Sequence, residues 1–561
     1  MSSLIGKRIG GQTYYYLREV ARVGGKPKIV SQRYLGKAED IAAAMAGAAM
    51  VPERTRHLAF GDVAAAWSVL QRLGVAGVID EVMGSRRADA AASVGTYLAL
   101  AALNRVVAPC SKLAFADWWA ATAADRWVKI PAVALDHRRF WDAMDTVSPA
   151  RLAEIERRLG QVMAERFALD LSALVLDMTN FATFIDTGNE KAPVAQRGKA
   201  KQKRHDLRLV GLALVVTRDG GIPVVSRAYP GNRPDVTQFS AVIDELVTRY
   251  QQLAGGVEEL TVVFDAGNDS AANQDHLAGL GLRYVASLPP SQHPDLLAIP
   301  GRSYQIVDQA RFGGLTAVEA AATALGRTRR VIVTHSPTFH ARQARGFDQT
   351  LAKAGRQLSA LADRLARGNT RRPRSQVEAE IRQITDPRWV SRVLQVTLTG
   401  TRPASLRLSW RIDSQARHAL EAEIFGKRIL FTDRDYWPVA EVIAAYRSQA
   451  DAEAGFRQLK DRHVVSFSPM FHWTEQKIRV HVFYCVLALA IAHLMRRQAA
   501  QAGLDLSVRE LLHTLAGIGE TVLIYPSTGG RPRARRILTE QDPTQQRLFD
   551  LFDLATYAPR A

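Results

Sequence analysis

The stretch YRSQADAEAGFRQLK, at residues 446–460, is the part of the chain around which the rest can be arranged. Its content of alanine, arginine, glutamine and leucine favours a helix. At 3.6 residues per turn, Tyr446, Glu453 and Lys460 lie in one line, and Gln449 and Arg457 fill the turns between them. A face with a phenol, an amide, a carboxylate and two cations suits phosphate and metal. The alternative is a solvated stripe with an ion pair between Glu453 and Arg457.

Composition indicates a globular protein of several domains that binds a polyanion. The 561 residues are 47% hydrophobic and 23% charged, and lysine and arginine outnumber the acids by 74 to 55. The resulting charge of +19 and the sequence pI of about 10.1 make nucleic acid the expected partner.

Cysteine usage and hydropathy point to a reducing compartment. Cys110 and Cys485 lie far apart and without CxxC spacing, so neither a disulfide framework nor a zinc site is indicated. We expect a cytoplasmic protein that associates with the nucleoid when it binds DNA. The N-terminus lacks the apolar segment of a signal peptide. The apolar run at residues 482–492 is too short to span a bilayer and predicts a buried helix.

The first third of the chain predicts a small β unit and then helices. Residues 12–35, with TYYYLREV, VGGK and KIVSQRYLG, predict a β-hairpin that either touches DNA or caps the fold. Residues 56–170 carry apolar side chains at three- and four-residue spacing, which predicts a helical domain. We assign its tryptophans to the core.

From residue 172 the pattern changes to short apolar strands and helices. The strand ALVL ends in Asp177, and the strands LRLVGLALVVT and IPVVSRAY complete an antiparallel meander. A helix with Asp235 as its N-cap then precedes LTVVF, which ends in Asp265. The predicted order is β-β-β-α-β-α-β. Reacting groups collect at the carboxyl ends of strands in such sheets, so the two aspartates predict one site, although either alone is more often a cap.

Residues 290–432 depart from this alternation, and we interpret them as an insertion that is mostly β. It contains a basic helical pair at residues 341–384, which is either a solvated arm or, as its charge favours, a DNA-binding track. After residue 460 the chain predicts helices and a basic tail, GGRPRARR.

Three carboxylates from separate elements, without a His/Cys cluster, are the ligands that Mg²⁺ prefers. Two such ions could activate a water or a 3′-hydroxyl and stabilise the leaving oxygen of a phosphodiester. Without metal, repulsion among Asp177, Asp265 and Glu453 should raise at least one pKa. The loop cations Lys203 and Arg204 would join the helix face in binding phosphate. Nucleotide-binding, serine-hydrolase and HExxH motifs are absent from the sequence.

With Asp177, Asp265 and Glu453 on this element order, the chain resembles bacterial DDE transposases of the IS4 superfamily, and most closely the IS1634-type insertion-sequence transposases. The family marks its third acid with Y-x2-R-x3-E-x6-K, and here Gln449 replaces the arginine. Arg447 or Arg457 supplies that charge, or the subgroup does not use one. The segments TYYYLREV, KRHDL, YPGNRPD and GKRILFTDRD also resemble the family.

The resemblance implies an RNase H-like α/β core interrupted by a β-rich insertion. The expected parts are an N-terminal β-hairpin segment (1–55), a helical domain that could bind DNA (56–170), the two parts of the core (171–290 and 433–500) on either side of the insertion (291–432), and a basic helical C-terminal segment (501–561).

The activity that the resemblance implies is Mg²⁺-dependent nicking at element ends, with Mn²⁺ as a substitute ion, and transfer of the freed 3′-hydroxyl into target DNA. Relatives form a hairpin and move by cut-and-paste. The implied partners are terminal inverted repeats, target DNA and a second copy of the chain in a synaptic dimer. The implied catalytic and metal-binding residues are Asp177, Asp265 and Glu453, and the DNA-binding residues are Tyr446, Arg447, Gln449, Arg457, Lys460, Lys203 and Arg204.

Two other classes of function remain open from the residues themselves. A metal-dependent nuclease on the same fold would nick DNA without joining ends. A DNA-binding relic of a transposase would bind without cutting. A basic RNA-associated protein is a third possibility, but the chain lacks the aromatic signatures of RNA-binding modules.

Overall fold

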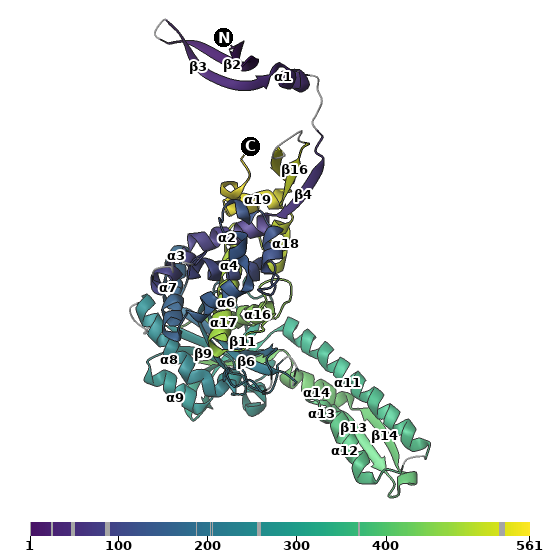
Figure 1. Cartoon of the computed structure of the whole chain (residues 1–561). Helices are drawn as coiled ribbons and strands as arrows, with labels where there is room; N and C mark the ends of the chain where they lie inside the picture. The colour runs from purple at the N-terminus through teal and green to yellow at the C-terminus, as the bar shows by residue number, and fades with distance from the viewer. Residues whose placement is uncertain are drawn as a thin grey trace.

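The computed structural model describes residues 2–23, 26–45, 51–84, 90–186, 188–201, 204, 206–254, 260–368, 371–526 and 533–560. A mixed nine-stranded sheet forms the centre, in the order β10-β11-β12-β15-β9-β8-β5-β6-β7. Figure 1 shows helices packed around this sheet and an elongated arm that projects from it. The predicted α/β class is confirmed.

The strands from β5 to β9 form the predicted RNase H-like core. β5, β6 and β7 are an antiparallel meander, β8 lies parallel to β5, and β9 lies parallel to β8. This confirms the order β-β-β-α-β-α-β. The elements are β5 (Ala173–Thr183), β6 (Arg208–Thr217), β7 (Pro223–Pro230), α8 (Asp235–Ala254), β8 (Thr261–Phe264), α9 (Ala271–Gly279) and β9 (Arg283–Leu288). Asp235 is the first residue of α8 and not the residue before it.

The predicted helical domain is present, but a strand precedes it. β4 (Arg54–Ala59) pairs with β16 (Gly519–Ile524), which also pairs with β17 (Ala534–Leu538). The helices expected after residue 460 are present, but the strands β16 and β17 were not predicted. The helices of the domain are α2 (Gly61–Arg72), α3 (Val75–Met83), α4 (Val94–Val107), α5 (Phe115–Ala120), α6 (His137–Asp145) and α7 (Pro149–Phe167), and the C-terminal segment adds α18 (Val508–Ala516) and α19 (Pro543–Leu551).

The stretch at 446–460 is not one helix. Tyr446 lies in α15 (Val439–Arg447), and Glu453 lies in α16 (Gln449–Leu459). Ser448 separates the two, and its hydroxyl donates to the carbonyl of Ala445 at 2.5 Å. Such a local bond offers the backbone an alternative to a continuous helix. The predicted single line from Tyr446 to Lys460 is therefore wrong.

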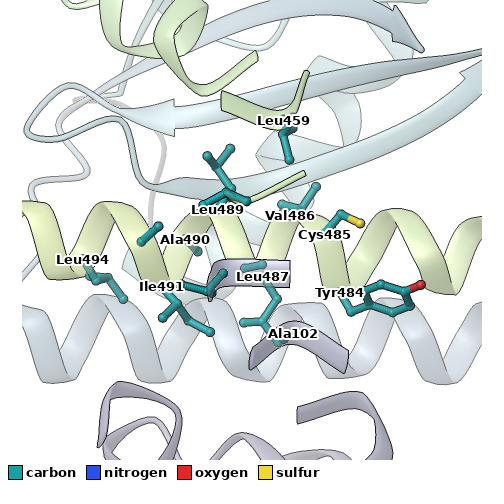
Figure 2. Packing of buried hydrophobic residues seen from close by; sticks show 14 of the residues in the cluster. Ala102, Leu459, Tyr484, Cys485, Val486, Leu487, Leu489, Ala490, Ile491 and Leu494 are labelled. Atoms are coloured by element: carbon teal, nitrogen blue, oxygen red, sulfur yellow. The ribbon is translucent and has the colours of Figure 1, made fainter. Parts of the chain in front are cut away.

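Helix α17 (Glu475–Gln501) joins the helical domain to the sheet. Figure 2 shows Leu487 on the side of α17 that faces Ala102 of α4, and Leu489 on the side that faces Leu459 of α16. Burying each such leucine contributes about 1.5–3 kcal/mol of transfer free energy. By length and composition α17 could cross a membrane, but 94% of its most apolar window is buried inside the protein. The prediction of a buried helix at residues 482–492 is confirmed.

The segment 291–432 contains the expected strands and helical pair, but the interpretation of it as mostly β is wrong, because its helices account for more of it than its short strands do. β10 (Gln305–Ile306), β11 (Thr316–Ala324), β12 (Arg327–His335) and β15 (Lys427–Thr432) extend the central sheet. The projecting arm in Figure 1 is mainly helical. It consists of α11 (Pro337–Ala366), α12 (Arg374–Thr385), α13 (Val390–Val393), β13 (Leu394–Thr399), β14 (Arg407–Ile412) and α14 (Ser414–Ile424).

The N-terminal unit has one strand more than the predicted hairpin. β1 (Ser2–Ile9), β2 (Gln12–Val23) and β3 (Lys26–Lys37) form an antiparallel sheet, followed by α1 (Ala38–Met45). Figure 1 shows this sheet apart from the rest of the molecule. The two glycines of VGGK lie outside the described residues.

Candidate active site

Asp177 lies in the middle of β5 and not at its end. The strand continues to Thr183, and Asp177 pairs with Leu214 of β6. Successive side chains of a strand point to opposite faces. Val175 and Phe181 belong to the hydrophobic cluster that includes α16 and α17. Asp177 lies an even number of residues from both, so it shares their face of the strand and faces these helices. The predicted strand ends at Asp177 because the apolar run ends there, whereas the observed strand continues through six further residues to Thr183.

Asp265 follows β8 directly, as predicted. Its carboxylate accepts a hydrogen bond from the backbone N–H of Gly267 at 3.0 Å and caps the short helical turn that follows. β8 and β5 pair in parallel with Val263 opposite Val175. Two residues further along both strands, Asp265 therefore lies level with Asp177.

Glu453 approaches the same face from α16, which packs against β5. Its side chain is 61% exposed and forms an ion pair with Arg457 at 3.5 Å. The ion pair between Glu453 and Arg457, which the alternative interpretation of a solvated helix face predicted, is therefore present. A surface pair of this kind contributes about 0–1 kcal/mol, so Glu453 can exchange Arg457 for another cation at little cost.

The three carboxylates influence one another electrostatically. The pKa of Asp177 is raised from 3.8 to about 7, mainly by burial. The charges of Asp265 and Glu453 contribute to this rise, and a hydrogen bond from the N–H of Met178 and the charge of Lys201 oppose it. The expectation that one carboxyl would have a raised pKa agrees with this, although burial is the largest cause.

The donor set is chemically suited to a hard cation but is not gathered tightly. Asp177, Asp265 and Glu453 offer only oxygen ligands, as Mg²⁺ requires. In the part of the chain that the structure describes, however, no three Asp, Glu, His or Cys side chains are close enough to hold an ion. With Glu453 on an exposed helix face and turned to Arg457, the third ligand is the one that must move.

Two lysines lie beside Asp177. Lys460, the C-cap of α16, donates from Nζ to Thr179 Oγ1 at 2.7 Å, and burial lowers its pKa. Lys201 donates to the carbonyl of Met178 at 2.6 Å and pairs with Asp235 at 2.8 Å. Sequence reasoning missed Lys201 because it lies in a loop with several equivalent cations.

The predicted loop cations are placed differently. Lys203 lies outside the described residues. Arg204 forms a bidentate ion pair with Asp206 at 2.7 and 2.9 Å. Arg204, Arg462 and Lys460 also line a cleft of about 320 Å³ together with Phe181 and other side chains at the end of β5. The cleft therefore joins basic side chains to the neighbourhood of Asp177.

The other predicted DNA contacts differ in exposure. Tyr446 is buried, and its hydroxyl donates to Ser287 Oγ at 2.9 Å. Gln449 is also buried. Arg457 is 69% exposed, and the guanidinium of Arg447 lies 4.7 Å from the ring centre of Phe312. The structure places Asp177, Asp265 and Lys460 near one another and Glu453 on the exposed side of the neighbouring helix α16, and the DNA-binding roles stay predictions.

With this fold and cluster of acids, the chain belongs to the transposase DDE domain family, whose model matches residues 170–489. The matched region includes Asp177, Asp265 and Glu453. Among solved structures, the chain is similar to a piggyBac transposase synaptic complex with hairpin DNA, with 7% identity, a TM-score of 0.36 and coverage of 83% of this chain and 82% of that one. No curated protein matches the chain.

Proposed function

We propose that the protein is the transposase of an insertion sequence of the IS4 superfamily, of the IS1634 type. In this proposal it nicks DNA at the element ends and joins the freed 3′-hydroxyl to target DNA, in cut-and-paste movement. The family match over the core and the motif around Glu453 support it. The observation that supports it most is the level placement of Asp177 and Asp265 on neighbouring parallel strands, under the helix of Glu453.

Each acid has a distinct part in this proposal. Asp177 is held by its strand and Asp265 by its hydrogen bond with Gly267, so these two form the fixed side of a cation site. Glu453 completes it by turning from Arg457. Divalent metal, Mg²⁺ or Mn²⁺, supplies a Lewis acid that activates the attacking oxygen and stabilises the leaving one. Ionised Asp177 is required for binding, and its raised pKa makes binding depend on pH near 7.

The neighbouring cations would hold the DNA backbone. Lys460, Arg204 and Arg462 line the cleft beside β5, and Arg457 becomes free when Glu453 turns away. Contacts of this kind position a duplex without reading its sequence. A synaptic dimer, in which two copies hold two ends, and a place on the bacterial nucleoid are parts of the same proposal.

The test is a strand-cleavage and strand-transfer assay on labelled duplexes that carry the DNA flanking the gene, with and without Mg²⁺. Glu453→Gln should keep DNA binding and lose both reactions. Glu81→Gln is a matched control, because Glu81 is 71% exposed and pairs with Arg158 at 3.3 Å, in a surface ion pair of the same kind.

The outcomes separate the rival functions. Nicking by the wild type without joining would replace the proposal with a nuclease. Binding without any metal-dependent cutting, equal in wild type and Glu453→Gln, would identify a DNA-binding relic. Loss of activity in Glu81→Gln as well would mean that charge alone, and not the position of Glu453, is responsible.

A further inference from the structure

The N-terminal sheet exposes both of its faces and carries a strong positive charge. Between residues 2 and 37 there are eight lysines and arginines and one acid, Glu19. Leu4, Ile9, Ile29 and Tyr34 are each more than 50% exposed. A three-stranded sheet with one short helix does not bury these side chains by itself, so the sheet has a surface that suits a polyanionic partner.

The strand register divides the sheet into two faces. Residues directly opposite each other on antiparallel strands share a face. Three cross-strand rows therefore belong to one surface, which we call the tyrosine face: Lys7, Tyr14 and Lys37; Ile5, Tyr16 and Tyr34; Ser3, Arg18 and Gln32. Ring contacts support this division, because the Tyr34 ring centre lies 5.3 Å from that of Tyr16 and 6.2 Å from that of Tyr14.

The opposite surface has a different character. Ala21 pairs with Lys28, and Leu17 pairs with Leu4 and Arg33. Leu17 and Ala21 are odd-numbered residues of β2, and Tyr14, Tyr16 and Arg18 are even-numbered, so the two sets point to opposite faces. Each of the two register shifts skips one residue of β3, so the residues of β3 still share a face with their partners on β2. Lys28 is exposed and carries the same charge as Lys7, and it lies on this opposite face, in the row of Ala21.

We propose that the tyrosine face binds duplex DNA in the major groove and reads its sequence. Arg18 and Gln32 lie directly opposite each other at one row, and these are the side-chain types that make bidentate contacts with guanine and adenine. Lys7 and Lys37 flank Tyr14 two rows away and neutralise phosphates.

The dimensions of the sheet agree with this partner. Neighbouring strands lie about 4.8 Å apart, so the outer strands of three are roughly 10 Å apart. The major groove is about 12 Å wide and accepts β elements. The tyrosine rings give the face a packed centre, and the Nζ of Lys7 lies 5.3 Å from the ring centre of Tyr16. The charge of the face selects a polyanion over a second copy of this basic chain.

This inference deepens the proposed function by assigning recognition of the element ends to the N-terminal sheet. Its test uses the full chain in EDTA, so that binding is measured without cleavage. The probes are labelled duplexes that carry the terminal inverted repeat flanking the gene, and the same duplexes with the repeat scrambled.

The double variant Arg18→Ala/Gln32→Ala should bind the repeat about 10-fold or more weakly and should lose its preference over the scrambled duplex. Lys7→Ala should weaken binding to both probes and reduce the dependence of affinity on salt. Lys28→Ala should change affinity for the repeat less than 2-fold. Circular dichroism and thermal unfolding of each variant would confirm that the sheet still folds.

Equal effects of Lys7→Ala and Lys28→Ala would overturn the assignment of the tyrosine face, because they would indicate unoriented attraction. Unchanged repeat preference in the Arg18→Ala/Gln32→Ala variant would overturn it as well. A smaller oligomer in sedimentation for Tyr34→Ala, without a change in DNA affinity, would overturn the proposal and identify the tyrosine face as an interface between two copies of the chain. If the chain binds the repeat through this face but never cuts it, the proposed catalytic function fails while this inference stands.

Discussion

Lys460 donates a hydrogen bond from Nζ to Thr179 Oγ1 at 2.7 Å, and this bond fastens the end of α16 to the strand that carries Asp177. The helix that carries Glu453 is thus tied to the strand that carries Asp177, at a position two residues after Asp177. Burial and the charge of Lys201 lower the pKa of Lys460, while the attraction of Asp177 opposes this. Lys460 therefore both ties α16 to β5 and places a positive charge near Asp177, beside that of Lys201.

Replacing Lys460 by methionine should move the rising part of the pH profile of DNA cleavage to higher pH. Removing a cation beside Asp177 favours the protonated carboxyl, so a higher pH is needed to ionise it. Thr179→Val is the matched control, because it removes the hydrogen bond and keeps the ammonium charge. An equal displacement of the profile in both variants would show that the bond, and not the charge, is responsible.

Replacing Asp177 by asparagine should abolish cleavage and stabilise the metal-free protein at pH 8. The pKa of Asp177 is about 7 in the folded state against 3.8 for the free group, so the folded state holds the proton more tightly. The wild type therefore loses stability as pH rises from about 4 to 7, and the asparagine variant does not share this loss. We expect a gain of roughly 1–3 kcal/mol at pH 8.

The measurement is urea unfolding of both proteins in EDTA at pH 8 and pH 4. At pH 4 the carboxyl is protonated in the folded state and the difference should largely disappear. A stability difference that is the same at both pH values would show that Asp177 is not a buried, raised-pKa group. Addition of Mg²⁺ at pH 8 should stabilise the wild type and leave Asp177→Asn unchanged.

Replacing Tyr446 by phenylalanine should cost about 1 kcal/mol of stability and leave DNA affinity within about 2-fold. The Tyr446 hydroxyl is buried and bonded to Ser287, so its loss removes an internal hydrogen bond. Tyr436→Phe is the control, because Tyr436 is fully exposed and should change stability by less than about 0.5 kcal/mol. A selective loss of DNA affinity in Tyr446→Phe would restore the predicted phosphate contact.

Local signals in the sequence are sufficient to predict most of the strands and helices of the core and the position of one acid, Asp265. The strand LTVVF ends where its apolar run ends, so Asp265 was placed correctly. The position of Asp177 within its strand could not be predicted in this way. The strand continues through MTNFAT because these residues pair with β6, and this pairing is visible only in the folded structure. The pairing of β4 with β16 joins residues more than 450 positions apart, and the spacing of apolar residues within either segment cannot predict it. Lys201 could be chosen among its neighbours only from its contacts with Met178 and Asp235.

Replacing Arg105 by methionine should lower the free energy of unfolding by roughly 3 kcal/mol. Arg105 lies on α4, is 1% exposed, and donates to the carbonyls of Ser468 at 2.7 Å, Pro469 at 3.2 Å and Ser466 at 3.4 Å. These carbonyls belong to the loop that follows α16, so the side chain ties the helical domain to the helix of Glu453. Removing it leaves three carbonyls without their charged donor.

The same variant should reduce DNA cleavage more than DNA binding, because a loosened loop allows α16 to shift over β5 while the exposed cations remain. Arg139→Met is the matched control: Arg139 is an exposed arginine on α6 of the same domain, and its loss should change stability by less than about 0.5 kcal/mol. Arg105→Lys tests whether the three bonds or the charge matters, since an ammonium cannot reproduce the planar guanidinium fork. Wild-type cleavage by Arg105→Met, at a temperature where it remains folded, would show that the loop does not position Glu453.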